Sequence, residues 1–174
     1  MKIGVMKEIK PSEYRVAAVP SAVAELVRRG HEVFVEHDAG KGSGFSDDDY
    51  REAGATVEAD AAKIWNSVDM VYKVKEIFPE EYQYLRKDMI VFTYIHSNAH
   101  LDQTEALLKS GCTSIAYEDI SDDRGQWPLL SPMSANRQAR ALMITRMPHR
   151  MVASSRWAAR RFSMTVPWGS SAAS

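Results

Sequence analysis

The sequence predicts an α/β protein whose sheet is mainly parallel and doubly wound, of the flavodoxin-like kind. Short apolar runs rich in Val, Ile and aromatic residues alternate with stretches that carry helix start and stop signals. This alternation is typical of consecutive βαβ units, which place helices on both faces of a sheet. The 174 residues suffice for one domain with a sizeable core, or for one domain followed by a tail.

The expected elements follow from strand formers and helix caps. We expect strands at 2–6, 31–36, 89–93 and 113–117, and at most a short strand at 56–57. A further strand should begin at 70 and carry charged residues towards its end at 76. We expect helices at 20–29, 47–53, 60–65, 79–85 and 102–110. Pro20 suits a first helical position, Ser46 with Asp49 makes a capping box, and Gly111 suits a helix end.

The segment 70–76 (MVYKVKE) carries two lysines at the end of a strand expected inside the sheet. Lys73 and Lys75 would share one face, because side chains alternate along a strand. Ligands of open α/β sheets bind beyond the carboxyl ends of the strands, so a cation there is well placed to meet an anion. The alternative is that both lysines reach solvent as the strand leaves the sheet.

Three residues near expected strand ends carry complementary chemistry: Arg15, Lys75 and His96. The arginine fork matches a carboxylate, a lysine ammonium can hold a carboxylate or polarise a carbonyl oxygen, and a histidine can exchange a proton near neutral pH. Together they suit a small oxo- or amino acid, whereas each alone is more simply explained by a structural or solvated role. His100 competes with His96, but it sits at an expected helix start.

Other functional classes have weaker support. Residues 39–45 (AGKGSGF) suggest a phosphate loop, yet the spacing is not G-x-G-x-x-G and the acidic residues at 47–49 would repel a phosphate. Metal-ligand spacings are absent, so no metal is expected. The single cysteine, Cys112, excludes an intrachain disulfide, and no apolar run approaches the roughly 18 residues of a membrane helix. A reducing cytoplasm is therefore the expected compartment.

The charge is distributed unevenly along the chain. The whole chain carries −1, but residues 135–174 hold seven arginines and no lysine, aspartate or glutamate. Residues 1–134 hold 15 basic and 23 acidic residues, a net charge of −8. This break predicts a globular domain at 1–134 and a separate basic tail at 135–174.

Several separate motifs fall in the first 134 residues, in order and nearly without gaps. They are GVMKEIK at 4–10, EYRVA at 13–17, GKGSGFSD at 40–47, VKE at 74–76, FTYIH at 92–96, AYE at 116–118 and PLLSPMS at 128–134. This set resembles alanine dehydrogenase. The alpha subunit of the proton-pumping nicotinamide nucleotide transhydrogenase shares the fold family but matches less well, because a lysine–asparagine pattern replaces VKE there.

The resemblance implies an NAD-dependent oxidoreductase, typically a homohexamer, that interconverts L-alanine with pyruvate and ammonia. Carried over position by position, Arg15 and Lys75 would hold the carboxylate and keto oxygen of the substrate, and His96 would be the acid/base group. Met133 and Ser134 would line the cleft between the substrate domain and the NAD domain. The cofactor-binding residues would lie in the Rossmann domain that follows in the family.

The sequence departs from the family after Ser134. Where the family continues with Glu, a small-residue helix and a Rossmann NAD domain, this chain has Ala135-Asn136-Arg137 and the basic tail. We therefore expect a truncated substrate domain that binds no NAD and is inactive alone, followed by a tail translated out of frame. One alternative is a non-catalytic module that binds small keto or amino acids. The weaker alternative is a native basic arm that binds nucleic acid or an acidic membrane surface.

Overall fold

The computed structural model describes residues 1–127 and 129, and a six-stranded sheet organises them. The strands are β1 (Lys2–Val5), β2 (Glu32–Glu36), β3 (Thr56–Glu58), β4 (Met70–Tyr72), β5 (Ile90–Thr93) and β6 (Thr113–Ala116). They lie in the order β3-β2-β1-β4-β5-β6, and every neighbouring pair is parallel. The predicted parallel α/β sheet is therefore confirmed.

The strand order is that of a doubly wound fold. Without the short edge strand β3, the remaining strands follow the flavodoxin-like order 2-1-3-4-5, and β3 extends it to 3-2-1-4-5-6. The order reverses between β1 and β4, where Val5 pairs with Tyr72. In folds of this class, ligands bind beyond the carboxyl ends of the strands at such a reversal.

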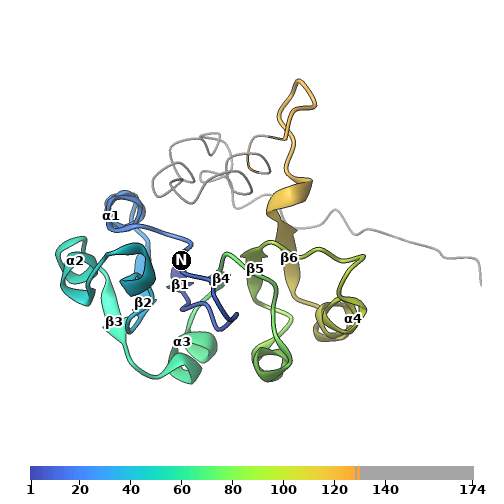
Figure 1. The fold of residues 1–174 in the computed structure, drawn as a ribbon, viewed down its shortest axis with the longest axis horizontal. Helices are drawn as coiled ribbons and strands as arrows, with labels where there is room; N and C mark the ends of the chain where they lie inside the picture. Colours follow the sequence, from blue (N-terminus) through green and yellow to red (C-terminus); the bar gives the residue numbers. More distant parts are fainter. Residues whose placement is uncertain (128, 130–174) are drawn as a thin grey trace, which may run out of the picture.

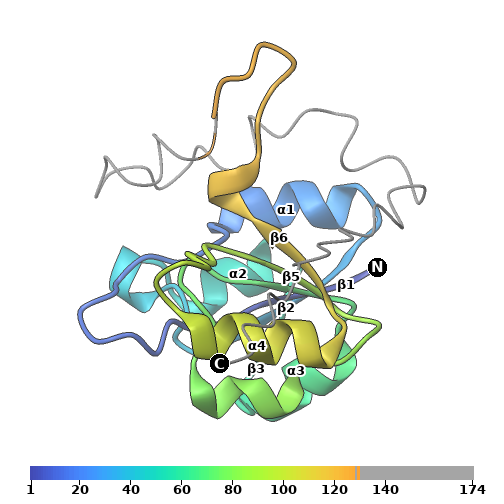
Figure 2. The same cartoon turned by 90° about the vertical axis from the view of Figure 1, so that its right-hand side faces the viewer.

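Helices cover both faces of the sheet (Figures 1 and 2). The α-helices are α1 (Pro20–Arg28), α2 (Asp47–Glu52), α3 (Ala61–Ser67) and α4 (Leu101–Ser110), and the 3-10 helices are η1 (Lys41–Ser43), η2 (Pro79–Tyr84) and η3 (Tyr117–Asp119). Val23 of α1 and Tyr50 of α2 belong to a core on one face of the sheet. Trp65 of α3 and Leu107 of α4 belong to a second core on the other face. Among the described residues, no helix is long and apolar enough to span a membrane.

Several local predictions are confirmed. Ser46 and Asp49 form the expected capping box at the start of α2. Asp60 caps α3 by accepting a hydrogen bond from the Ala62 N–H at 2.9 Å. Gly111 ends α4 at a φ of +69°, the left-handed conformation that favours glycine at a helix end. The helix expected at 79–85 is instead the 3-10 helix η2, which is the tighter form that short segments adopt.

The segment 70–76 differs most from expectation, because β4 ends at Tyr72 and both lysines follow the strand. Lys73 is fully buried, with its Nζ 2.5 Å from the Oε1 of Glu81 and 5.9 Å from the ring centre of Phe78. The alternative in which both lysines reach solvent is therefore wrong for Lys73. The physical reason is that η2 supplies the carboxylate without which a buried ammonium would be strongly disfavoured.

Candidate functional site

The candidate site lies where β1, β4 and β5 end, next to the reversal of strand order. The loop after β1 carries Arg15, the loop after β4 carries Lys75, and the loop after β5 carries His96. These three strands are neighbours in the sheet, and parallel strands present their carboxyl ends at one edge. The topology therefore brings three segments that are far apart in the sequence to the carboxyl ends of neighbouring strands.

Arg15 is half-buried and is paired with a carboxylate two residues earlier. Its Nε lies 2.7 Å from Glu13 Oε1 and its Nη2 lies 2.5 Å from Glu13 Oε2. Burial alone would raise the pKa of Glu13, but the hydrogen bonds from Arg15 outweigh that effect and hold the pKa below its usual value. The same pairing raises the pKa of Arg15. The guanidinium therefore uses the donors on Nε and Nη2 to hold the Glu13 carboxylate, as a fork that matches carboxylate geometry.

Lys75 is half-buried and acts on the same carboxylate. Its positive charge adds to the lowering of the Glu13 pKa, although less than Arg15 does. The charges of both cations predicted from the sequence thus act on one carboxylate, Glu13, which Arg15 contacts directly. Such a pair can hold the carboxylate of a small acid and can polarise a carbonyl oxygen beside it.

His96 is exposed, and the neighbouring carboxylate of Glu118 holds its main chain. Oε1 of Glu118 accepts hydrogen bonds from the N–H of His96 at 2.5 Å and of Ile95 at 3.0 Å, and it lies 3.6 Å from His96 Nδ1. His96 has a φ of +50°, which a residue with a Cβ rarely adopts, so these bonds stabilise an unusual backbone conformation. The second carboxylate oxygen of Glu118, Oε2, is buried and has no hydrogen-bond partner.

Tyr94 contacts His96 and is within electrostatic reach of Arg15. Its ring stacks on the His96 imidazole with 5.3 Å between centroids and 8° between planes. Burial raises the pKa of Tyr94 to about 12, and the charge of Arg15 opposes that rise. The structure thus pairs Arg15 with Glu13 and stacks His96 on Tyr94, whose pKa the charge of Arg15 influences.

The remaining sequence candidates are placed as follows. Met133 and Ser134 lie outside the described residues. His100 precedes α4 directly, with its Nε2 3.8 Å from Oε1 of the buried Glu76, which also pairs with Lys10. This arrangement ties three segments together and supports the structural interpretation of His100.

Glu8 is a candidate that the sequence analysis missed. It is largely buried, and burial raises its pKa to about 7, against the opposing effect of the Lys73 charge. Its two carboxylate oxygens accept hydrogen bonds from the N–H of Val74 at 2.6 Å and of Lys75 at 3.3 Å. A carboxyl group that titrates near neutral pH beside two candidate cations is typical of functional sites. No sequence signal identifies it, because its burial depends on a loop 66 residues later.

The glycine-rich loop supports Arg15 rather than a phosphate. Ser43 Oγ donates a hydrogen bond to the Tyr14 carbonyl oxygen at 2.9 Å. A Cβ on Gly42 would lie 2.8 Å from that same oxygen, so only glycine allows the two loops to pack this closely. The sequence expectation that this loop has a local structural purpose agrees with these contacts.

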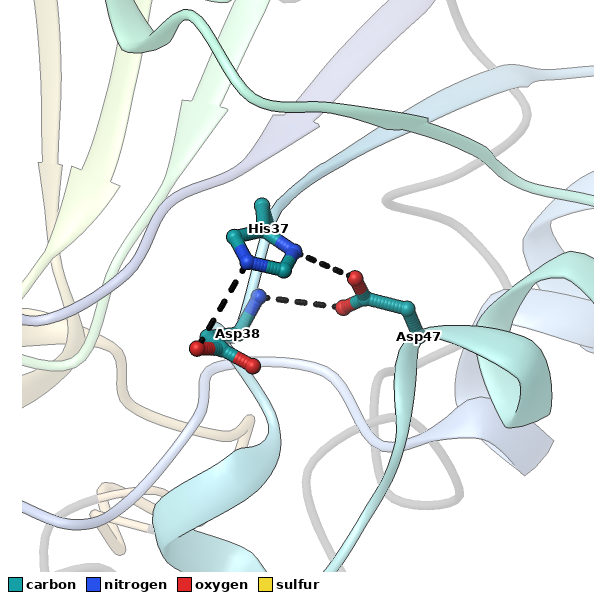
Figure 3. Close-up of side chains that lie close together, drawn as sticks. All are labelled: His37, Asp38 and Asp47. Carbon is teal, nitrogen blue, oxygen red and sulfur yellow. Dashed lines mark hydrogen bonds and ion pairs between the residues drawn. The ribbon is translucent and has the colours of Figure 1, made fainter.

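A second polar cluster joins the end of β2 to the start of α2 (Figure 3). His37 Nδ1 lies 2.5 Å from Asp47 Oδ2, and His37 Nε2 lies 3.6 Å from Asp38 Oδ2. These side chains are of types that can bind a metal ion, and their ligand atoms lie within 4.8 Å of one another. However, the Lys41 ammonium lies 3.1 Å from the same oxygen of Asp38, and this charge opposes a bound cation. We interpret the cluster as a structural tie between the two elements.

The fold and the edge residues define a doubly wound α/β domain with two cations and a histidine where its strand order reverses. The sequence model described as "Alanine dehydrogenase/PNT, N-terminal domain" matches residues 4–136. The chain therefore belongs to the alanine dehydrogenase/PNT N-terminal domain family.

Individual relatives agree with this assignment. Over 134 residues the chain is 52% identical to an alanine dehydrogenase of Halomonas elongata and 50% identical to one of Bacillus subtilis. Each match covers 77% of this chain, but only 36% and 35% of the respective relatives. The chain thus spans little more than a third of the length of these relatives.

Two solved structures resemble the fold. An L-alanine dehydrogenase superposes with a TM-score of 0.73 at 49% identity, covering 76% of this chain and 36% of that chain. A transhydrogenase from Sinorhizobium meliloti superposes with a TM-score of 0.68 at 28% identity, covering 76% of this chain and 40% of that chain.

Proposed function

We propose that residues 1–134 form the substrate domain of an NAD-dependent alanine dehydrogenase and bind pyruvate and L-alanine where β1, β4 and β5 end. The observation that carries this proposal is that the loops after three neighbouring strands carry Arg15, Lys75 and His96, and that Arg15 there binds the carboxylate of Glu13 through two donors. A site that already holds a carboxylate on an arginine fork suits the carboxylate of a small acid. The higher identity to the alanine dehydrogenase structure than to the transhydrogenase supports this substrate class.

Each side chain has a distinct role in the proposed site. Arg15 binds and orients the substrate carboxylate through its planar fork. Lys75 polarises the keto oxygen of pyruvate, on which negative charge develops as ammonia adds to the carbonyl carbon. His96 has a ring exposed to solvent and backed by Tyr94, so it exchanges a proton with the reacting oxygen or nitrogen of the substrate.

The nicotinamide cofactor would carry the hydride in this chemistry, as NAD when it accepts the hydride from alanine and as NADH in the reverse direction, and the described residues do not fit a dinucleotide. The glycine-rich loop is occupied by its contact with Tyr14. The helix that follows it, α2, begins with Asp47, Asp48 and Asp49, whose charges would repel a pyrophosphate. We therefore propose that this chain alone binds no NAD and does not oxidise alanine, and we assign no hydride-transfer step to its residues.

The test is a titration of the full 174-residue chain with pyruvate, followed by NMR. We expect a Kd of roughly 1 mM, because water screens the two cations. Arg15→Ala or Lys75→Ala should raise the Kd by about tenfold, as each removes a charge-assisted hydrogen bond. His96→Ala should change it by less than about twofold, because a proton-transfer group acts mainly on the chemical step.

Lys63→Ala provides a charge-matched control, because Lys63 pairs with Glu58 near the β3 edge of the sheet. It should leave the Kd unchanged. Unaltered pyruvate binding in both Arg15→Ala and Lys75→Ala would overturn the proposed function.

A non-catalytic module for small keto or amino acids would use the same residues. Neither possibility predicts that this chain alone is active. Formation of NADH from alanine and NAD by this chain alone would contradict the proposed lack of activity.

In the proposed function the chain acts in the cytoplasm and associates into a homo-oligomer, as the family resemblance implies. Analytical ultracentrifugation measures that association directly.

A further inference from the structure

The main chain of Lys75 is held from two sides, although Lys75 lies outside any strand. On the β1 side, Oε2 of Glu8 accepts a hydrogen bond from the Lys75 N–H at 3.3 Å. On the β5 side, the hydroxyl of Thr93 donates a hydrogen bond to the Lys75 carbonyl oxygen at 2.6 Å. Thr93 is fully buried, so its hydroxyl has no competition from solvent.

These two side chains replace strand pairing where it has ended. β4 stops at Tyr72, and the last pairs it forms are Val5 with Tyr72 and Tyr72 with Phe92. Main-chain hydrogen bonds to the neighbouring strand continue to Val74, whose carbonyl oxygen accepts a hydrogen bond from the Tyr94 N–H at 3.4 Å. At Lys75, the N–H and the carbonyl oxygen are bonded to side chains. The bonds from Glu8 and Thr93 fix Lys75 relative to both neighbouring strands.

We propose that Thr93 and Glu8 are positioning residues that hold Lys75 at the site, and this proposal rests on the proposed pyruvate-binding function. Neither side chain needs to touch the substrate. Their effect is transmitted through the Lys75 backbone, which sets where the ammonium stands relative to Arg15. Placement of a binding group within a fraction of an ångström is what such supporting hydrogen bonds provide.

Thr93→Val is the sharper variant, because it removes the hydroxyl while preserving shape and charge. Glu8→Gln changes a charge beside the anion site and would combine two effects. Thr93→Ser restores a hydroxyl and serves as the rescue variant. Thr113→Val is the matched control. Thr113 is exposed at the start of β6, which is at the amino ends of the strands, whereas Lys75 lies beyond their carboxyl ends.

The first measurement needs no ligand. Hydrogen exchange and chemical shifts of the backbone amides in the full chain should change at Lys75 and Glu76 in Thr93→Val, and they should return toward wild type in Thr93→Ser. Thr113→Val should leave these amides unaltered. If the amides of Lys75 and Glu76 are also unaltered in Thr93→Val, the positioning role is wrong.

The second measurement is the pyruvate titration. Thr93→Val should raise the Kd by about threefold to tenfold, because it loosens a cation without removing it. In a chain that already carries Lys75→Ala, adding Thr93→Val should change the Kd no further. An equal effect in both backgrounds would show that Thr93 acts on stability in general, and would overturn the inference. If wild type binds no pyruvate, the proposed function fails, and the amide measurement still decides whether Thr93 positions Lys75.

Discussion

Lys73 and Glu81 form an ion pair inside the domain, with 2.5 Å between Nζ and Oε1 and with both residues buried. Glu81 also accepts a hydrogen bond from the Phe78 N–H at 2.8 Å, so the pair fixes the loop after β4 to the start of η2. The loop that carries Lys75 therefore depends on a buried charge and its partner.

Replacing Lys73 alone should destabilise the domain strongly. Lys73→Met leaves the Glu81 carboxylate buried without its cation, and we expect a loss of about 3–5 kcal/mol in the free energy of unfolding. The double variant Lys73→Met/Glu81→Gln should recover much of this loss, because the amide still accepts from Phe78. Urea unfolding followed by circular dichroism measures both values. A single variant as stable as wild type would show that the pair is dispensable.

The stability should depend on pH through Glu8. Its folded-state pKa is raised to about 7 from 4.5, so the folded state holds a proton that the unfolded state releases. This contribution to stability is complete below about pH 4.5 and is lost as pH rises through about 7. It amounts to on the order of 3 kcal/mol.

Glu8→Gln separates this effect from the other titrating groups. The difference in unfolding free energy between wild type and Glu8→Gln should shift against wild type from pH 5 to pH 8, as measured by urea unfolding at each pH. A constant difference over this range would mean that Glu8 titrates normally.

Gly42→Ala should weaken pyruvate binding through the Arg15 loop. The added Cβ would lie 2.8 Å from the Tyr14 carbonyl oxygen, which belongs to the main chain and cannot rotate away. We expect a loss of about 1–3 kcal/mol in stability and a Kd raised by about threefold to tenfold. Gly111→Ala is the control, because it strains a helix end at a φ of +69° on the side of the sheet away from Arg15. It should destabilise the chain without altering pyruvate affinity.

Glu13→Gln should strengthen pyruvate binding. Glu13 is a built-in carboxylate that competes with the substrate for the positive charge of Arg15 and Lys75. Removing its charge while keeping its shape should lower the Kd by about twofold to fivefold at low salt. The gain should shrink at high ionic strength, as isothermal titration at two salt concentrations would measure. A weaker complex would indicate that Glu13 serves to orient Arg15 instead.

The basic segment 135–174 should prove to be translated out of frame. The composition changes at residue 135, and the family match ends at residue 136. We expect a shift of one or two bases near codon 135 of the genomic DNA to restore a small-residue helix, a strand and a G-x-G-x-x-G turn. Sequencing that DNA decides the matter, and shifted frames that close before codon 174 would mark the segment as native.

The sequence predicted the sheet and most element boundaries, because hydrophobic periodicity and helix caps are local signals. Its proposal of Arg15, Lys75 and His96 as site residues stays a prediction, with all three in loops that follow neighbouring strands. It did not predict that Lys73 is buried, because the residues around a lysine at a strand end do not show that Glu81 of η2 will pair with it. For the same reason it missed Glu8 and Thr93, whose importance comes from main-chain contacts with a distant loop. Residue types alone could suggest the chemistry of the candidate site, whereas the groups that contact its main chain could be found only in the structure.

The parallel pairing of all six strands has a consequence for the order in which the chain can fold. Within residues 1–127 and 129, no neighbouring strands are joined by a tight turn, so this part of the chain offers no hairpin as an early nucleus. β1 is synthesised first, yet its partner β4 follows about 65 residues later, which is several seconds at ordinary rates of translation. During that interval Ile3 and Val5 lack their β4 neighbours Met70 and Tyr72. We therefore expect a chaperone that binds nascent apolar segments to bind this protein at β1.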